Sequence, residues 1–269
     1  MNQTSRPRMP AVFFGHGSPM NVLEDNRYTR AWQQVGTSLP KPKAILAISA
    51  HWYTRGTGIT AMAAPQTIHD FGGFPQALFD MRYPAPGDPA LAARVRELLM
   101  PVDVQLDHSW GLDHGTWSVL VKAFPDADVP VVQLSIDGTQ PAAWHLALGR
   151  RLAPLRDEGV LIIGSGDVVH NLRLMMRGNH PAYDWAQRFN ERVREHLQKG
   201  EMEVLAEYEQ WGNDATLSVP TAEHFLPLLY VAGTRQGNET VSILVDGIEA
   251  GSISMLTAAI GMEAVTQAA

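Results

Sequence analysis

Short apolar runs alternate along this chain with longer segments in which apolar residues recur at helical spacing. Five of the runs are rich in Val, Ile and Leu and hardly alternate between apolar and polar positions. They cover residues 11–15, 44–50, 129–136, 159–166 and 240–247. Runs of this kind are typical of strands that are covered on both faces. The pattern therefore predicts strands buried inside an α/β sheet.

The segments between the strands predict helices. They cover residues 88–101, 140–159, 182–200 and 221–233. The third segment is amphipathic and ends in basic residues and a glycine, which is typical of a helix C-terminus. In the fourth, Thr221 is suited to the N-cap position, and Pro227 predicts a break or kink because proline has no backbone N–H to donate.

Strand and helix signals alternate throughout, and no linker rich in Pro, Gly or Ser divides the chain of 269 residues. We predict an α/β fold with a single domain over 1–269, in which a central, largely parallel or mixed sheet is covered by helices on both faces. Its core spans about 9–262, with mobile tails at 1–8 and 263–269. In open sheets of this class, ligands bind beyond the carboxyl ends of the strands.

Composition narrows the function classes. Asp and Glu outnumber Lys and Arg by 28 to 21 and the basic residues are scattered, so nucleic acid is not an expected partner. The chain has no cysteine, which excludes disulfides, thiolate nucleophiles and cysteine-bound zinc. No apolar stretch is long enough to span a membrane, and the N-terminus lacks the apolar region of a secretory signal. We therefore expect a cytoplasmic protein without a membrane partner.

Several of the 10 histidines stand where predicted strands end. His16 closes the first strand and His51 the second, and His170 follows the fourth within a few residues. His224 lies at the start of a predicted helix, and His114 lies in a glycine-rich loop. Because imidazole is a preferred ligand of first-row divalent metals, the pattern indicates a metal centre at one edge of the sheet.

Each histidine taken alone is also explained as a polar side chain that is hydrogen-bonded near the surface. Taken together, the residues support an α/β metalloenzyme with a histidine-rich site, and the pattern alone goes no further. Other histidines fall on helical or loop stretches without convergence, and we predict them at the surface. They are His108, His145, His180 and His196.

At these same positions the chain resembles a known family. The segments "FGHGSPMNVLEDN", "ISAHWYTRGTGIT", "TIHDFGGFP", "WGLDHGTW", "GSGDVVHNLR" and "EHFLPLLYV" resemble those of the bacterial 4,5-DOPA dioxygenase extradiol proteins. These are class III extradiol ring-cleaving dioxygenases, related to protocatechuate 4,5-dioxygenase, and the resemblance runs from about Met9 to Met262. It implies a non-haem Fe(II) enzyme that opens a catechol with O2 to a muconic semialdehyde-type product. It also implies that Zn(II) can occupy the site.

The resemblance also implies site residues. Carried over by position, His16, His51 and His224 would be the metal ligands, His170 the catalytic acid and base, and His114 a second catalytic histidine that hydrogen-bonds substrate or oxygen.

The wider class uses a glutamate as the third metal ligand, and Glu223 directly precedes His224. Because adjacent helical side chains point about 100° apart, we expect only one of the two to reach the metal, and we favour His224. Glu223 then acts as a first-turn carboxylate that interacts with the helix dipole.

Further residues are predicted as substrate contacts, although core, turn or surface roles explain them as well. They are Phe71, Phe74, His69, Trp52 and Ser18. Asp113 and Asp167 either orient imidazoles or cap turns.

Three functions stay open. The first is the extradiol dioxygenase, with a DOPA-like or related catechol and O2 as its small-molecule partners. The second is a zinc-dependent hydrolase in which His170 acts as base toward metal-bound water. The third is a non-catalytic metal-binding homologue. The sequence decides neither which catechol is used nor whether the protein is a homo-oligomer.

Overall fold

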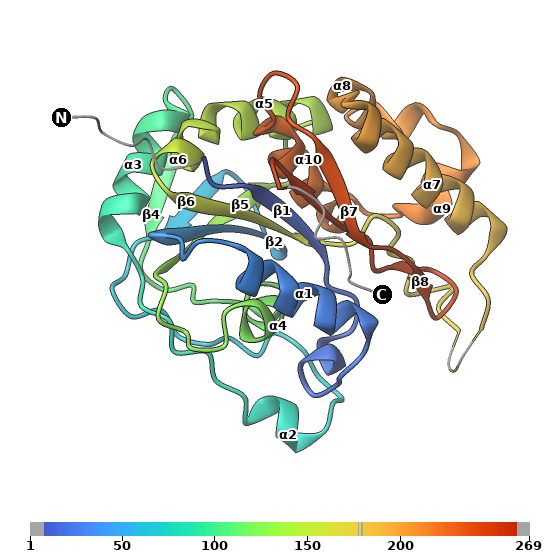
Figure 1. Ribbon diagram of the computed structural model, residues 1–269, viewed down its shortest axis with the longest axis horizontal. Coiled ribbons are helices and arrows are strands. Elements are labelled where there is room, and N and C mark those ends of the chain that lie inside the picture. Colours follow the sequence, from blue (N-terminus) through green and yellow to red (C-terminus); the bar gives the residue numbers. More distant parts are fainter. Residues whose placement is uncertain (1–7, 177, 179, 263–269) are drawn as a thin grey trace.

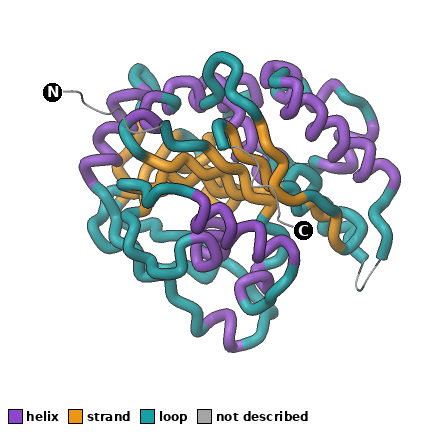
Figure 2. The backbone as a smooth tube through the Cα atoms, viewed as in Figure 1, coloured by secondary structure: helices purple, strands orange, loops and turns teal. Residues whose placement is uncertain are grey.

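The computed structural model describes residues 8–176, 178 and 180–262, which form an α/β fold around a central sheet (Figures 1 and 2). The sheet has eight strands in the order β4-β3-β5-β2-β6-β1-β10-β7. These are β1 (Ala11–Gly15), β2 (Ala44–Thr54), β3 (Thr57–Thr60), β4 (Val104–Asp107), β5 (Val131–Asp137), β6 (Val160–Gly166), β7 (Val241–Val245) and β10 (Thr257–Ile260). A separate hairpin joins β8 (Ile248–Glu249) to β9 (Ile253–Ser254).

Helices flank both faces of this sheet (Figure 1). The α-helices are α1 (Arg27–Ser38), α2 (Gln76–Phe79), α3 (Pro89–Leu99), α4 (His114–Ala123), α5 (Ala142–Leu152), α6 (Pro154–Asp157), α7 (Asp184–Lys199), α8 (Met202–Leu205), α9 (Asn213–Ser218) and α10 (Leu226–Gly233). The 3-10 turns are η1 (Pro19–Val22), η2 (Tyr208–Gln210) and η3 (Ala222–His224).

The sheet is mixed. β1, β6, β2 and β5 run parallel to one another, whereas β10 pairs antiparallel to β1 and to β7, and β3 pairs antiparallel to β5. The carboxyl ends of β1, β2 and β6 therefore meet at one edge. This arrangement confirms the predicted fold class.

Two apolar cores explain why the strands are so uniformly hydrophobic. In β1, Phe13 packs into the core on the side of α5 and α10, whereas Val12 and Phe14 pack into the core on the side of α1 and α4. In β2, Leu46 packs into the same core as Phe13, and Ile45 packs into the same core as Val12 and Phe14. Because both faces of these strands are buried, the sequence shows no polar face.

The short edge elements were not predicted. β3, β4 and β10 have four residues each, too few to give a periodic pattern. The start of α1 does carry a local signal, because Asn26 and Thr29 form a capping box.

Two helix predictions need correction at their prolines. The segment 140–159 is not one helix, because α5 ends at Leu152 and α6 begins at Pro154. In the segment 221–233, Thr221 makes no capping hydrogen bond, and a 3-10 turn precedes α10. Pro227 does not kink a helix interior. It lies in the first turn of α10, where its missing N–H costs nothing.

The predicted tails 1–7 and 263–269 lie outside the described residues. Arg8, placed in the N-terminal tail by the sequence, forms an ion pair with Asp157 at 2.7 Å. Within the described ranges, no helix is both long and apolar enough to cross a membrane.

His145 is not at the surface, contrary to the prediction. It lies on the inner face of α5, is fully buried, and its Nδ1 is 3.0 Å from the Tyr230 hydroxyl on α10. His108 and His180 are exposed as predicted, and His196 is half-buried against Glu201. The helical period of the sequence did not show which face of α5 meets another helix.

Buried His145 predicts a loss of stability in acid. Burial lowers the pKa of His145 from 6.5 to about 4, so between these values the unfolded chain binds a proton that the folded chain excludes. The free energy of unfolding is therefore unaffected above pH 6.5 and falls as the pH drops toward 4, by on the order of 3 kcal/mol from this residue. His145→Gln, which cannot titrate, should show a flatter pH dependence in urea denaturation.

Tyr230→Phe is the control for this measurement. It removes the hydrogen bond to His145 but keeps the buried ring, so the steep pH dependence should persist. Equal slopes for the wild type and His145→Gln would contradict the argument.

Candidate metal centre

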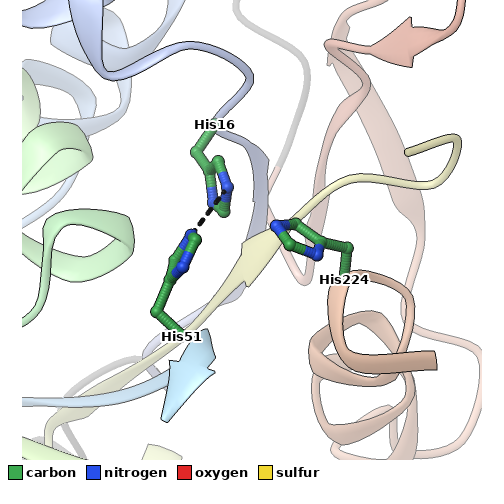
Figure 3. A group of neighbouring side chains, drawn as sticks. All are labelled: His16, His51 and His224. Carbon is green, nitrogen blue, oxygen red and sulfur yellow. Dashed lines mark hydrogen bonds between the residues drawn. The ribbon is translucent and has the colours of Figure 1, made fainter. Parts of the chain in front are cut away.

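Three histidines from distant parts of the chain point toward one another at the carboxyl edge of the sheet (Figure 3). His16 follows β1, His51 lies near the end of β2, and His224 ends η3. One nitrogen from each ring lies within 4.8 Å of the others, and Nε2 of His16 is 3.3 Å from Nε2 of His51. The structure thus brings together the three residues predicted as metal ligands.

Backbone irregularities aim two of these side chains. Gly17, directly after His16, has φ +57, a conformation that glycine adopts without strain. Its N–H donates to Oδ1 of Asp167 at 2.9 Å. In β2, the pairing register with β5 shifts between Ile48 and Tyr53, around His51. Such a bulge redirects a side chain, and here the imidazole faces the centre.

Glycines of β6 bring His224 onto the sheet. A Cβ at Gly166 would lie 2.2 Å from the carbonyl oxygen of His224, so only glycine permits this approach. The same carbonyl accepts a hydrogen bond from the N–H of Asp167 at 2.9 Å. Behind η3, α10 packs on α5 in close backbone contact, since a Cβ at Gly149 would lie 2.2 Å from the carbonyl of Tyr230. The position of His224 is therefore fixed by main-chain contacts.

Oxygen atoms hold the outer nitrogen of two of the three rings. Nδ1 of His16 is 3.0 Å from Oγ of Ser165, and because that hydroxyl donates to the carbonyl of Gly115, it accepts from the imidazole. Nδ1 of His224 is 3.2 Å from Oε1 of Glu223. An oxygen that accepts from Nδ1 keeps the proton on that nitrogen. The lone pair of Nε2 is then available to a metal. Glu223 therefore acts as the partner of His224, which agrees with the choice of the histidine as ligand.

The environment keeps these imidazoles uncharged. Burial and the neighbouring imidazoles together hold the pKa of His16 and of His224 well below the ordinary value, and they lower that of His51 to about 3. Neutral imidazoles with aligned lone pairs are the form that binds a divalent cation.

Asp167 adds a second sign of a cation. Its side chain is buried, and Oδ2 lies 3.4 Å from Nε2 of His16 but has no hydrogen-bond partner among the described residues. Burial raises the pKa of Asp167 well above its usual range. A cation at the centre would offset that cost, because an unpaired buried carboxylate is otherwise strongly unfavourable. Asp167 therefore combines the two roles considered for it: Oδ1 accepts from the backbone in the turn at Gly17, and Oδ2 lies beside the imidazole of His16.

His114 and Asp70 form the neighbouring part of the cluster. His114 begins α4; its N–H donates to Oδ1 of Asp70 at 2.8 Å, and its Nδ1 is 2.9 Å from Oδ2. Burial alone would raise the pKa of Asp70, but the hydrogen bonds from His114 outweigh it and lower the pKa. Asp113, in contrast, caps α4 by accepting from the N–H of Thr116.

The sequence pattern did not indicate Asp70 or Ser165 as residues of the site. Asp70 follows His69 in a glycine-bearing loop, and this polar pair was the one available signal. Ser165 lies in the buried strand β6, and no neighbouring residue in the sequence indicates that its hydroxyl contacts a site residue.

His170 stacks on His224, with ring centroids 3.4 Å apart and planes 9° apart. It follows β6, where its N–H donates to the carbonyl of Ser218. Burial lowers the pKa of His170 to about 4, so near neutral pH this ring can accept a proton.

A cavity of about 800 Å³ opens onto the histidines. Phe71, Phe74 and Ser18, which the sequence suggests as substrate contacts, are among the residues that line it. Its walls also include residues that the sequence did not single out for this purpose: Arg27, Tyr28, Leu172, Met175, Glu249, Ile253 and Met255.

Two predicted substrate contacts lie elsewhere. Trp52 points away from His51, because neighbouring strand residues face opposite sides, and it stacks on Trp110 with centroids 5.6 Å apart. His69 packs against Phe71 and Trp117, with Nε2 3.0 Å from the carbonyl of Met81. Neither residue lines the cavity that opens onto the histidines.

Comparison with known proteins places the chain in a family. A family model described as the catalytic LigB subunit of aromatic ring-opening dioxygenase matches residues 10–255. The chain belongs to the LigB family. It is 59% identical to a 4,5-DOPA dioxygenase extradiol of Escherichia coli K12 over 262 residues, which covers 96% of each protein. It is 38% identical to the Beta vulgaris protein of that name over 253 residues, covering 90% of this chain and 92% of the other.

A solved structure agrees with this placement. The crystal structure of an uncharacterized E. coli K12 protein superposes with a TM-score of 0.84 at 53% identity, over 94% of this chain and all of that one. These findings confirm the resemblance and the prediction of an aromatic ring-opening extradiol dioxygenase. In the LigB chain described here, the clustered histidines form a site fit for a metal ion.

Single alanine substitutions at His16, His51 or His224 should abolish stoichiometric metal binding, because each removes one of three converging imidazoles. Metal content after loading with Zn(II) and dialysis, measured by elemental mass spectrometry, checks this. Glu223→Gln should keep the ion but bind it about 10- to 100-fold more weakly, as expected for loss of an outer partner.

His108→Ala, at an exposed histidine outside the cluster, is the control and should bind metal like the wild type. Full metal content in all three alanine variants would show that the ion binds elsewhere.

Proposed function

We propose that this LigB-family chain is an extradiol dioxygenase that opens a DOPA-like or related catechol with O2 at an Fe(II) site, giving a muconic semialdehyde-type product. The observation that carries the proposal is the convergence of three neutral imidazoles at the base of a cavity with apolar walls. The names of the similar E. coli and Beta vulgaris proteins support the catechol and its extradiol cleavage.

Histidine nitrogens suit both Fe(II) and Zn(II), and zinc ranks above iron in affinity for such donors. We therefore expect purified protein to carry zinc unless it is loaded with iron without air. When bound, iron(II) supplies the redox chemistry with O2 that zinc lacks and lowers the pKa of the catechol hydroxyls.

His170 is the proposed acid and base. Its low pKa keeps the ring neutral, so an imidazole nitrogen can take the proton that a catechol hydroxyl loses on binding. It can later return that proton to an oxygen of the opened ring. The stack on His224 holds His170 beside the proposed metal ligands while its ring faces the cavity.

His114 is the proposed hydrogen-bonding partner of substrate or oxygen. Its backbone N–H donates to Oδ1 of Asp70, and its Nδ1 lies 2.9 Å from Oδ2 of the same carboxylate, so Nε2 is the nitrogen left for the ligand. Phe71 packs edge-on against His114, with centroids 5.4 Å apart, and together with Phe74 it forms an apolar wall that excludes water from the ring.

Iron-loaded protein supplied with L-DOPA or another catechol should consume O2 stoichiometrically and form a yellow product, whereas zinc-loaded protein should not. An oxygen electrode and an absorbance scan measure the two signals together. If iron-loaded protein consumes no O2 with any catechol while the zinc form cleaves esters or amides, the site is a hydrolase instead.

His170→Gln should lower kcat of the iron-loaded protein by about 10²- to 10⁴-fold, the usual contribution of a general acid or base. Its iron content should stay at the wild-type level, because His170 is not one of the proposed ligands. His108→Gln serves as the matched control and should leave kcat unchanged. Loss of iron from His170→Gln would count against the assigned role.

A further inference from the structure

The outer end of the cavity carries ionic groups for which ring cleavage has no use. Arg27, Glu24 and Glu249 line the same cavity as the histidines, together with Tyr28 and with apolar residues such as Phe74 and Met255. Because these three ionic residues are exposed whereas His16 and His224 are buried, a ligand whose ring reaches the histidines would have charges of both signs on its solvent side.

A buried phenol fixes two of these charges relative to each other. Tyr28 is 3% exposed, and its hydroxyl donates to Oε1 of Glu249 at 2.6 Å. The Tyr28 hydroxyl oxygen in turn accepts from Nη2 of Arg27 at 2.5 Å, and the guanidinium carbon lies 4.6 Å from the centre of the Tyr28 ring. Arg27 and Glu249 are therefore held at a set spacing although both side chains reach the surface.

The turn between β7 and β8 lies directly against this group. A Cβ at Gly247 would lie 2.2 Å from Nη2 of Arg27 and 2.4 Å from the hydroxyl of Tyr28. The carbonyl of Gly247 also accepts a hydrogen bond from the N–H of Met255, which lines the cavity. The backbone thus supports Arg27 from behind.

Both ionic groups keep bonding capacity. Among the described residues, Arg27 donates one side-chain hydrogen bond and forms no ion pair, and Oε2 of Glu249 accepts no hydrogen bond. A guanidinium has several further N–H donors in a plane that suits a carboxylate. Arg30, one turn further along α1, differs in that Asp25 already occupies it through two hydrogen bonds.

We propose that Arg27 and Glu249, held by Tyr28, select catechols whose side chain carries both a carboxylate and an ammonium group. Arg27 binds the carboxylate and Glu249 the ammonium, while the ring lies against the apolar wall with its hydroxyls toward the histidines. This inference rests on the proposed function, because it takes a catechol as the ligand of the cavity. The residues named here determine specificity and take no part in ring opening.

The test measures binding to zinc-loaded protein, in which no turnover is expected. Isothermal titration calorimetry gives dissociation constants for L-DOPA, for 3-(3,4-dihydroxyphenyl)propionate, which has only the carboxylate, for dopamine, which has only the ammonium, and for uncharged 4-methylcatechol. Arg27→Gln should weaken the two carboxylate-bearing ligands by about tenfold, the usual effect of losing one charge-assisted hydrogen bond. It should not weaken dopamine or 4-methylcatechol.

Glu249→Gln should show the reverse pattern and weaken L-DOPA and dopamine. Arg27→Lys, which keeps the charge, should recover part of the carboxylate preference. Arg30→Gln is the matched control on the same helix and should bind all four ligands like the wild type. Equal melting temperatures and zinc contents establish that the variants are folded.

The two proposals fail in different ways. If Arg27→Gln and Glu249→Gln keep the wild-type ratio of L-DOPA to 4-methylcatechol affinity, the selection by these residues is overturned and the proposed function stands. If wild-type protein binds neither ligand, the catechol itself is the wrong ligand class and both proposals fall.

Discussion

Uncharged imidazoles crowded into one buried space are the constraint on which the rest of this structure depends. A proton on His16, His51 or His224 would be opposed by burial and by the neighbouring rings, so their lone pairs stay available. Ser165 and Glu223 occupy the outer nitrogens of two of the rings and orient them. A cation would satisfy the three converging lone pairs together and would offset the cost of the Asp167 oxygen, which has no hydrogen-bond partner among the described residues.

Such crowding requires elements to approach more closely than side chains normally allow. Gly166 admits the main chain of His224 to the end of β6, and Gly15 lies against the backbone at Met255, where a Cβ would be 2.6 Å away. Contacts of this kind link β1, β6 and η3 into a rigid frame, so the histidines are positioned by backbone and not by flexible loops. Glycines lose more conformational entropy on folding than other residues, and burial of the two apolar cores on either face of the sheet offsets this loss.

The cavity is lined by residues of three kinds, and the proposed roles follow these kinds. The buried neutral imidazoles suit a cation and proton transfer, and Phe71 and Phe74 suit an aromatic ring. Arg27 and Glu249 at the outer end suit opposite charges on a side chain. The proposed chemistry therefore lies at the edge of the sheet. The proposed selectivity lies at the contact between α1 and the β8–β9 hairpin.

The sequence by itself determined the longer strands of the sheet and the edge at which the histidines meet. Burial on both faces leaves a continuous apolar run, as at Val12 and Phe13, and parallel strands deliver their carboxyl ends to one side. The resemblance to the family added the roles of His170 and His114, which no local spacing encodes.

Only the tertiary structure decided which side chains face the site. Trp52 turns away from His51 because the strand alternates, and His145 is buried because α5 meets α10. Ser165 lies 149 positions from His16, and Glu249 lies 221 positions from Tyr28. Contacts between residues so far apart leave no periodic trace in the chain, since they depend on how whole elements pack and not on any neighbouring residue.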